Sequence, residues 1–323
     1  MNIELLIGTE DGKGAFMPAA ESAEWQTEIS GSAGKLTCNI LCDRAFEISE
    51  GVPIRFKADG KRIFFGYVFG KTAGADGRMR LVCYDQIRYL LNKDTYVYEG
   101  KTASQLLTLI AEDFSLRIGS VEDSKYVIPY RVEENSMLLD MIENAIELTY
   151  HNSGKRYVLY DEFGRLCFRE ITSVYGGGRC LLIGGGSGEE LSVVSSIDKG
   201  VYNKVKLFYN SRKSGSRDIY TAYDSKNAKK WGVLQYTGSL KEGENGQAKA
   251  EELLKLYGGK NFKVEVKGAF GDTDLRAGCA AAVSRKVFRG MGGEDKDRYM
   301  LAERVVHRFS GQGHFMDIVL TDI

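Results

Sequence analysis

The chain has 323 residues, and its 44 Lys and Arg balance 44 Asp and Glu, so the formal net charge is zero. Hydrophobic residues make up 43% and charged residues 27%, the balance of an ordinary globular protein, which excludes a disordered polar tail and a coiled coil. A zero net charge also argues against binding of nucleic acid through the bulk field of the protein, so no sequence-specific nucleic-acid partner is expected. The length predicts one large domain or two to three smaller ones.

Glycine is abundant and proline is scarce. The 38 glycines are about 12% of the chain against a usual ~7%, whereas there are only three prolines. Many glycines with few prolines favour tight hairpins and bulges over proline-rich linkers. The 18 Tyr and 15 Phe favour half-buried β surfaces.

The start of the chain and its apolar runs predict no targeting or membrane segment. Glu4 interrupts the first apolar run and no basic region precedes it, so we expect no signal peptide. No apolar stretch approaches the ~18 residues that a membrane span requires, so no stable membrane insertion is expected.

The cysteines are scattered and contain no C-x-x-C pair, so neither a zinc ribbon nor a thioredoxin-type site is indicated. We expect reduced, mostly buried thiols in a cytoplasm. The six are Cys38, Cys42, Cys83, Cys167, Cys180 and Cys279.

The pattern of the first 95 residues predicts β-strands. Apolar and polar residues alternate over 35–41 and again over 78–84, and 62–69 is a long β-rich run. The segment 70–77, rich in Gly, Ala and Asp, predicts the turn of a hairpin between the last two runs.

The hydrophobic period then becomes helical. Thr102 and Gln105 form a capping-box pattern, which predicts a helix whose apolar stripe includes Leu106 and Ile110. A second helix is predicted from about 136 to 149, with Gly154 in the loop beyond it. Residues from about 96 to 153 therefore predict a small helical insertion.

Strands resume after the helices. Residues 156–160 and 165–169 predict a hairpin about the turn 161–164. The glycine clusters 176–178 and 184–186 predict a loop and a boundary. From about residue 191 the chain is β-rich, with one helix over 247–257 and a C-terminal hairpin whose arms are 301–309 and 314–321.

The two β regions end alike. Each finishes with two strands about a glycine-containing turn, and each last strand closes on an aspartate, Asp85 and Asp322. This pattern favours two copies of one β module. We expect a first β domain at 1–95, an α/β insertion with two helices and a hairpin at 96–185, and a second β domain with one helix at 186–323.

Phosphate-binding and nucleophile motifs are not supported. Gly70-Lys71-Thr72 invites a P-loop interpretation, but Gly66 precedes Gly70 by three intervening residues instead of four, and a strand follows, so the end of a hairpin is favoured. The glycine-rich run 184–188 lacks the spacing of a dinucleotide fingerprint and of a nucleophile elbow, so a flexible loop is favoured.

The three histidines are His151, His307 and His314, and none forms an H-x-x-x-H pair. His307 and His314 lie on opposite arms of the C-terminal hairpin and could face each other as a zinc site or catalytic pair, although cross-strand packing is favoured.

The clustered charges favour solvated loops. Glycosidase chemistry requires two carboxylates at a set separation in one cleft, which sequence alone cannot place, and a calcium loop requires further ligands. The basic stretches 212–217 and 226–230 are either a contact loop for a charged partner or, as we favour, solvated loop. The acidic pairs are Glu189/Glu190, Asp272/Asp274 and Glu294/Asp295/Asp297. No catalytic, cofactor-binding or metal-ligating residue is predicted.

Three stretches resemble, in order, the XkdQ/YqbQ-like tail hub proteins of Gram-positive prophages and the wider late-control-D-like baseplate-hub group. The first is 78–85 followed by 89–92, where the first β module ends. The second helix leads into the second stretch, 154–164. The third comprises 268–278 and 307–316.

The resemblance implies a mainly β protein in which two related β-barrel tube modules flank a small helical α/β domain. It implies a homotrimer whose six barrels match a sixfold tail tube above and a trimeric central spike below. The implied partners are the tail tube protein, the central spike protein and other baseplate proteins. The implied place is the virion, in the baseplate of a contractile phage, prophage or bacteriocin-like tail assembled in the host cytoplasm.

The resemblance also favours contacts between subunits through glycine-rich loops and sheet edges. We expect 70–77 and the loop around 212–224 to be contact regions. A non-enzymatic hub is the first hypothesis. A peptidoglycan hydrolase of a tail, and a carbohydrate- or receptor-binding tail protein, are the alternatives.

Overall fold

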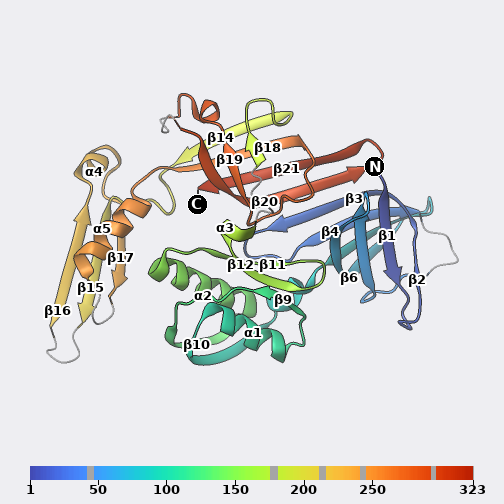
Figure 1. Cartoon of the computed structure of the whole chain (residues 1–323), viewed down its shortest axis with the longest axis horizontal. Coiled ribbons are helices and arrows are strands. Elements are labelled where there is room, and N and C mark those ends of the chain that lie inside the picture. The colour runs from blue at the N-terminus through green and yellow to red at the C-terminus, as the bar shows by residue number, and fades with distance from the viewer. Residues whose placement is uncertain (42–46, 175–180, 211–215, 241–244, 292–295, 323) are drawn as a thin grey trace. The chain divides into compact units, whose positions relative to one another are not determined.

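The computed structural model describes residues 1–41, 47–174, 181–210, 216–240, 245–291 and 296–322 (Figure 1). The described residues form two compact units, 1–192 with 264–321 and 193–263 with Asp322. Cys42, Cys180, the glycines 176–178, Glu294, Asp295 and residues 211–215 of the expected contact loop lie outside the described residues. The chain is mainly β, as predicted.

A sheet of 13 described strands contains strands from both ends of the chain. Within this sheet β13 (Leu181–Ile183) pairs with β19 (Ala280–Val283), and β19 pairs with β20. The main path runs through β14 (Glu190–Ser196), β18 (Asn261–Phe270), β21 (Gly313–Asp322), β20 (Arg298–Ser310), β3 (Ala19–Glu28), β4 (Lys35–Leu41), β7 (Arg78–Tyr84), β6 (Lys61–Ala73), β5 (Pro53–Ala58), β1 (Ile3–Gly8) and β2 (Ala15–Phe16).

The N-terminal and C-terminal strands are joined where β3 pairs with β20. The pairing is antiparallel and runs from Glu28 opposite Arg304 to Ser22 opposite Ser310. Because β3 pairs with β4 along its other edge, it has no edge left to close against β1. The described strands therefore form one open sheet, and the expected closure into two barrels is not seen among them.

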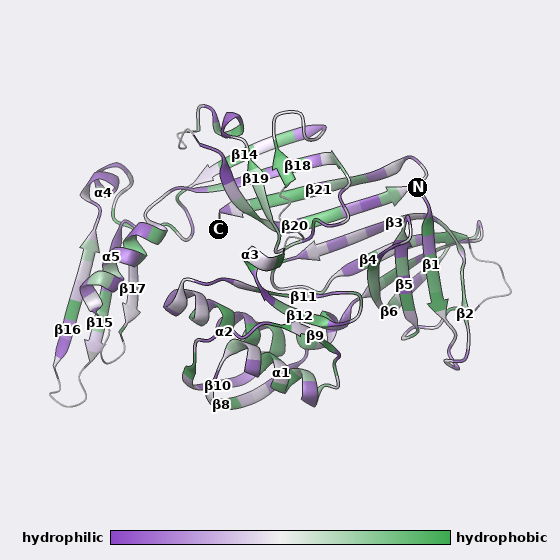
Figure 2. Ribbon diagram, viewed as in Figure 1, coloured by the Kyte–Doolittle hydropathy of each residue, from purple (hydrophilic) through white to green (hydrophobic). Residues whose placement is uncertain are grey.

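The predicted hairpins are present. β6 and β7 pair about the turn after Ala73, and β11 (Tyr157–Asp161) pairs with β12 (Leu166–Glu170). β20 and β21 are neighbours in the sheet on either side of a turn at Gly311. Figure 2 shows hydrophobic and hydrophilic residues interspersed along the strands, as expected for a sheet with one buried face.

The insertion contains the two predicted helices. α1 (Ala103–Asp113) begins with the capping box of Thr102 and Gln105, and α2 (Leu138–Ser153) ends at Gly154, which has φ +69°. The insertion also contains a pair of strands that the sequence did not predict, β8 (Lys93–Lys101) and β10 (Ile128–Met137). β9 (Ile118–Val121) adds in parallel to β12. The core of the insertion includes Leu106, Leu107, Ile110, Leu138, Met141, Ile142 and Phe168.

The unit 193–263 is a three-stranded sheet with one long helix. β15 (Lys204–Asn210) pairs with β16 (Arg217–Tyr223) and with β17 (Gln235–Ser239). α5 (Gly246–Tyr257) confirms the predicted helix, and it packs on one sheet face through a core that includes Val205, Leu207, Ala222, Ala250 and Leu253.

The prediction of loops in two segments of this unit was wrong. The described part of 212–224 is mostly strand β16, and the basic stretch 226–230 lies in helix α4 (Ser225–Trp231). Asp224 starts α4 because its carboxylate accepts hydrogen bonds from the backbone N–H groups of Lys226 and Asn227, 3.0 Å each.

In the described part of the chain, no helix has the length and apolar character that crossing a membrane requires. The division into domains at residues 95 and 185 stays a prediction.

We predict that Thr27→Val weakens the packing of the N-terminal strands against the C-terminal segment. The buried Thr27 hydroxyl accepts a hydrogen bond from the backbone N–H of Ala277, 3.0 Å away. The valine leaves that N–H unpaired, so the free energy of unfolding should fall by about 1–3 kcal/mol. Denaturant unfolding followed by tryptophan fluorescence measures it.

Thr37→Val is the matched control. Thr37 is also buried, on the neighbouring strand β4, and its hydroxyl makes no hydrogen bond among the described residues. Its replacement should change the free energy of unfolding by less than about 1 kcal/mol. Equal losses in both variants would contradict the role given to Thr27.

Candidate functional site

A buried polar cluster lies where three parts of the chain meet, and we call it the polar junction. It consists of Asp85 and Gln86 from the end of the first strand region, Asp161 from the insertion and Arg276 from the C-terminal region. The Gln86 side chain donates from Nε2 to Asp161 Oδ2, 3.1 Å, and Arg276 Nη1 donates to the backbone carbonyl of Asp161, 2.8 Å. One turn of the insertion is thereby held from both sides.

Asp85 begins the 3-10 helix η1 (Gln86–Leu91), which follows β7. Its Oδ1 accepts from the backbone N–H of Ile87 at 3.0 Å, and its Oδ2 accepts from the N–H of Gly34 at 3.0 Å. A side chain at Gly34 would collide with this carboxylate. Asp85 therefore fixes the start of β4 against the end of β7, which gives the strand-ending aspartate noted in the sequence a structural role.

Both carboxyl groups are buried, and burial disfavours their charged forms. Burial raises the pKa of Asp161 to about 6, against hydrogen bonds from the Gly164 N–H and the Gln86 amide that lower it. Burial also raises the pKa of Asp85, and the nearby Asp161 charge raises it further. The Arg276 guanidinium opposes both shifts.

Arg276 is held largely by aromatic rings. Its guanidinium carbon lies 4.2 Å from the ring centroid of Tyr160 and 6.0 Å from that of Trp25. Its Nε is buried and has no hydrogen-bond partner among the described residues. The guanidinium group therefore contacts strand β11 through the Tyr160 ring and the hydrogen bond to Asp161, and it contacts strand β3 through the Trp25 ring.

His307 and His314 do face each other, as the hairpin predicted, but His307 is buried and His314 is half-buried. His307 Nε2 lies 2.8 Å from the Leu275 carbonyl oxygen, and Nδ1 lies 2.9 Å from His314 Nε2. Because a carbonyl only accepts, Nε2 of His307 carries the hydrogen and His314 donates to Nδ1.

The surroundings of His307 are those of a packing residue. The side chain is fully buried, and burial lowers its pKa to about 3, so it is neutral. Its ring stacks on Trp25 with centroids 5.0 Å apart, and the His314 ring stacks on Phe309 at 4.2 Å. A substrate has no access to His307, so the geometry gives no support to a catalytic role.

The other candidate residues remain apart. Among the described residues no three His, Cys, Asp or Glu side chains are placed to hold a metal ion. Glu190 pairs with Lys267 at 2.7 Å, Asp272 and Asp274 lie in a turn, and Asp297 accepts from the Arg285 N–H at 2.8 Å.

The glycine-rich segments adopt turns or strand. Gly70 lies in β6, and Gly77 ends the turn before β7 with φ +77°, so the P-loop interpretation fails. In the 184–188 segment, Ser187 Oγ accepts from the Gly184 N–H at 2.8 Å. The role of 70–77 as a contact region stays a prediction.

The four described cysteines are buried and unpaired, as expected. Burial raises the pKa of the Cys83 thiol to about 12 and also raises that of Cys38. Their thiols are therefore protonated and unreactive at neutral pH.

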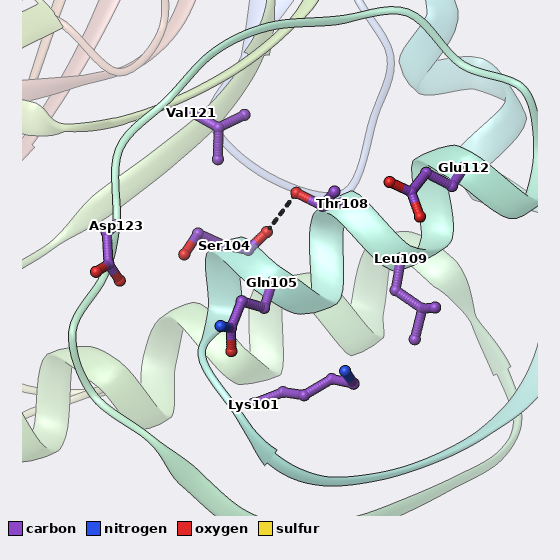
Figure 3. A pocket seen from close by; sticks show the side chains of 8 residues that line it. All are labelled: Lys101, Ser104, Gln105, Thr108, Leu109, Glu112, Val121 and Asp123. Carbon is purple, nitrogen blue, oxygen red and sulfur yellow. Dashed lines mark hydrogen bonds between the residues drawn. The ribbon is translucent and has the colours of Figure 1, made fainter.

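Two shallow pockets lie on the unit that contains the large sheet. One, of about 390 Å³, is open beside α1, and its lining includes Lys101, Ser104 and Asp123 (Figure 3). The other, of about 330 Å³, lies over β3, β18, β20 and β21 and is lined by charges of both signs, including Glu24, Lys267 and Arg308. Neither lining contains a nucleophile paired with a histidine base.

We predict that Asp161→Asn flattens the pH dependence of stability. The pKa of Asp161 rises from 3.8 to about 6 on folding, so its contribution to stability is full below about pH 4 and is lost as the pH rises to about 6. Relative to the asparagine variant, the wild-type free energy of unfolding should fall by on the order of 2 kcal/mol across that interval. Denaturant unfolding at a series of pH values measures it.

The control is Glu162→Gln, which alters an exposed carboxyl of the same turn. Its profile should keep the wild-type slope between pH 4 and 6. A parallel course of the wild-type and Asp161→Asn profiles would refute the electrostatic assignment.

Comparison with known proteins agrees with this architecture. A family model described as YQBQ-like matches residues 23–321. The uncharacterized protein YqbQ of Bacillus subtilis strain 168 is 30% identical over 282 residues, covering 84% of this chain and 82% of that protein. The phage-like element PBSX protein XkdQ of the same organism is 28% identical over 281 residues, with the same coverage.

Among solved structures, the 43 kDa tail protein of prophage MuSo2 from Shewanella oneidensis has a TM-score of 0.64 at 15% identity, covering 100% of this chain and 98% of that one. At that identity the likeness establishes a shared fold. The family match spans nearly the whole chain and includes every strand of the joined sheet except β1 and β2 and the start of β3. The chain therefore belongs to the YqbQ-like family, as its sequence resemblance predicted.

Proposed function

We propose that this protein is a structural hub of a phage-tail or tail-like baseplate, in which three copies join a sixfold tail tube to a central spike. The observation that carries the proposal is the family match over residues 23–321, together with the similarity to a protein of a phage-like element, on a chain with the fold of a prophage tail protein. We infer a place in the virion, after assembly in the host cytoplasm.

We propose that the large sheet contains a duplicated module. β1 to β7 form one part of the large sheet, and β13, β14 and β18 to β21 form the other, with β3 and β20 at the seam. We take the two parts as related tube modules that flank the insertion, with boundaries near 95 and 185. Two such modules in each of three copies present six similar surfaces, which suits contact with a sixfold tube.

One edge of the sheet offers a means of assembly. In the described structure, β14 ends the path of strands, so it leaves one edge of backbone donors and acceptors unpaired within the described residues. Strand addition at such an edge gives affinity through the backbone without special side chains. We propose the β14 edge, with the 70–77 segment, as contacts with the tube protein or with other copies.

We expect the purified protein to form a trimer and to bind its tube or spike neighbour. Sedimentation velocity gives the mass of the assembly, and electron microscopy of the co-purified complex should show a threefold or pseudo-sixfold ring. A monomer at every concentration, with no affinity for either neighbour, would refute the hub proposal.

We also expect no peptidoglycan hydrolysis by the purified chain. His307 is buried and neutral, and neither pocket lining contains a histidine. Zymography should show no clearing, with a known lysozyme as the positive control. Clearing that disappears in a folded His314→Ala variant would favour the hydrolase alternative.

A further inference from the structure

The balanced net charge hides a strong segregation of charge along the chain. Residues 193–263 contain 14 Lys and Arg against 7 Asp and Glu, a net charge of +7. Residues 93–153, which form β8, β10, α1 and α2, contain 5 against 11, a net charge of −6. Such asymmetry between parts of one chain is typical of surfaces that meet an oppositely charged partner.

Three of these positive residues lie on one exposed face of the three-stranded sheet, which we call the basic face. It consists of Lys204, Lys206, Phe208, Arg217, Ile219 and Tyr223. Strand registry places Lys204 opposite Tyr223 and Phe208 opposite Ile219, so these side chains share a side of the sheet. α5 packs on the other side. The remaining positions of the face on β16 and β17, namely Thr221, Gln235, Thr237 and Ser239, include no acidic residue.

The basic face combines apolar and cationic groups. Ile219 is 52% exposed and Tyr223 is 51% exposed. Lys206 and Arg217 lie over the Phe208 ring, with their charged groups 5.3 Å and 5.2 Å from its centroid. Exposed apolar groups ringed by cations are typical of a protein-binding surface.

A second face, in the acidic segment, has the complementary character. On the outer side of the β8–β10 pair, Val97 lies opposite Val132 and Glu99 lies opposite Tyr130. Val97, Tyr130 and Val132 are 60%, 59% and 50% exposed. Glu134 follows Val132 at the exposed end of the strand. We call these five residues the acidic face; Tyr98, between Val97 and Glu99, points the other way into the core.

We propose that the basic face of one copy docks on the acidic face of the next copy. Each face has exposed apolar side chains beside charged ones, and the charges of the two faces are opposite in sign. Such complementarity favours binding and steers the encounter of the two surfaces. Because each copy presents both faces, the contact is head-to-tail, and such contacts form a ring when the rotation closes. The proposal rests on the proposed trimeric hub and names the surfaces that join its copies.

Charge reversal tests the contact. Sedimentation velocity over a concentration series compares the wild type with K204E/K206E, with E99K/E134K and with the combined fourfold variant. Each double variant should weaken self-association at least about tenfold, because like charges then face each other. The fourfold variant restores opposite charges across the contact, so it should recover most of the loss. Added salt should weaken wild-type association.

The control is K255E/K260E, which makes the same change of net charge within 193–263 but off the basic face. Lys255 lies on α5 and Lys260 in the segment after it, and both are exposed. This variant should assemble like the wild type, and circular dichroism of every variant should show the wild-type fold.

The outcomes separate this inference from the hub proposal. A wild type that forms trimers, together with a K204E/K206E variant that forms them equally well, overturns the docking of these faces and leaves the hub intact. Loss of assembly in both double variants without recovery in the fourfold variant also overturns it, since the two faces then do not meet. A wild type that stays monomeric and binds no tail neighbour overturns both.

Discussion

The pairing of β3 with β20 is the constraint on which the rest of the large sheet depends. It joins residues about 280 positions apart, so folding must close a very long loop before the pairing contributes stability. The rings of Trp25 and His307, which are paired across the seam, stack with their centroids 5.0 Å apart. Aromatic contacts across neighbouring strands are strong for their area, which suits a seam that offsets a large entropic cost.

The hydrogen bonds of the polar junction fix relative positions that apolar packing at the seam leaves less well defined. Apolar packing alone tolerates small shifts, whereas Asp85 and Asp161 each require particular backbone N–H groups in place. Burying two carboxylates disfavours folding unless their acceptor atoms are satisfied, so a shifted insertion would lose both hydrogen bonds and solvation. The junction therefore fixes how the insertion meets the two strand regions.

Local signals made much of the fold predictable. The capping box at Thr102, the alternation in β7 and the turn at 161–164 each act within a few residues, and the structure contains all three elements. The seam, the β8–β10 pair and the meeting of Asp85 with Asp161 depend on distant partners, which alternation and spacing do not encode. Helix α4 was missed because its polar composition hid the Asp224 cap that begins it.

The net charge of the whole chain does not show where the charges lie, because a sum over the chain removes the information that position carries. A value of zero argued against binding of nucleic acid through the bulk field, but it does not reveal the +7 in 193–263 and the −6 in 93–153, which are each large for segments of about 60–70 residues. Like charges within one segment repel each other and oppose its compaction, so a segment that keeps such an excess needs a compensating favourable interaction. The proposed contact with an oppositely charged surface on another copy would provide such an interaction at short range, while the neutral total limits repulsion between whole molecules.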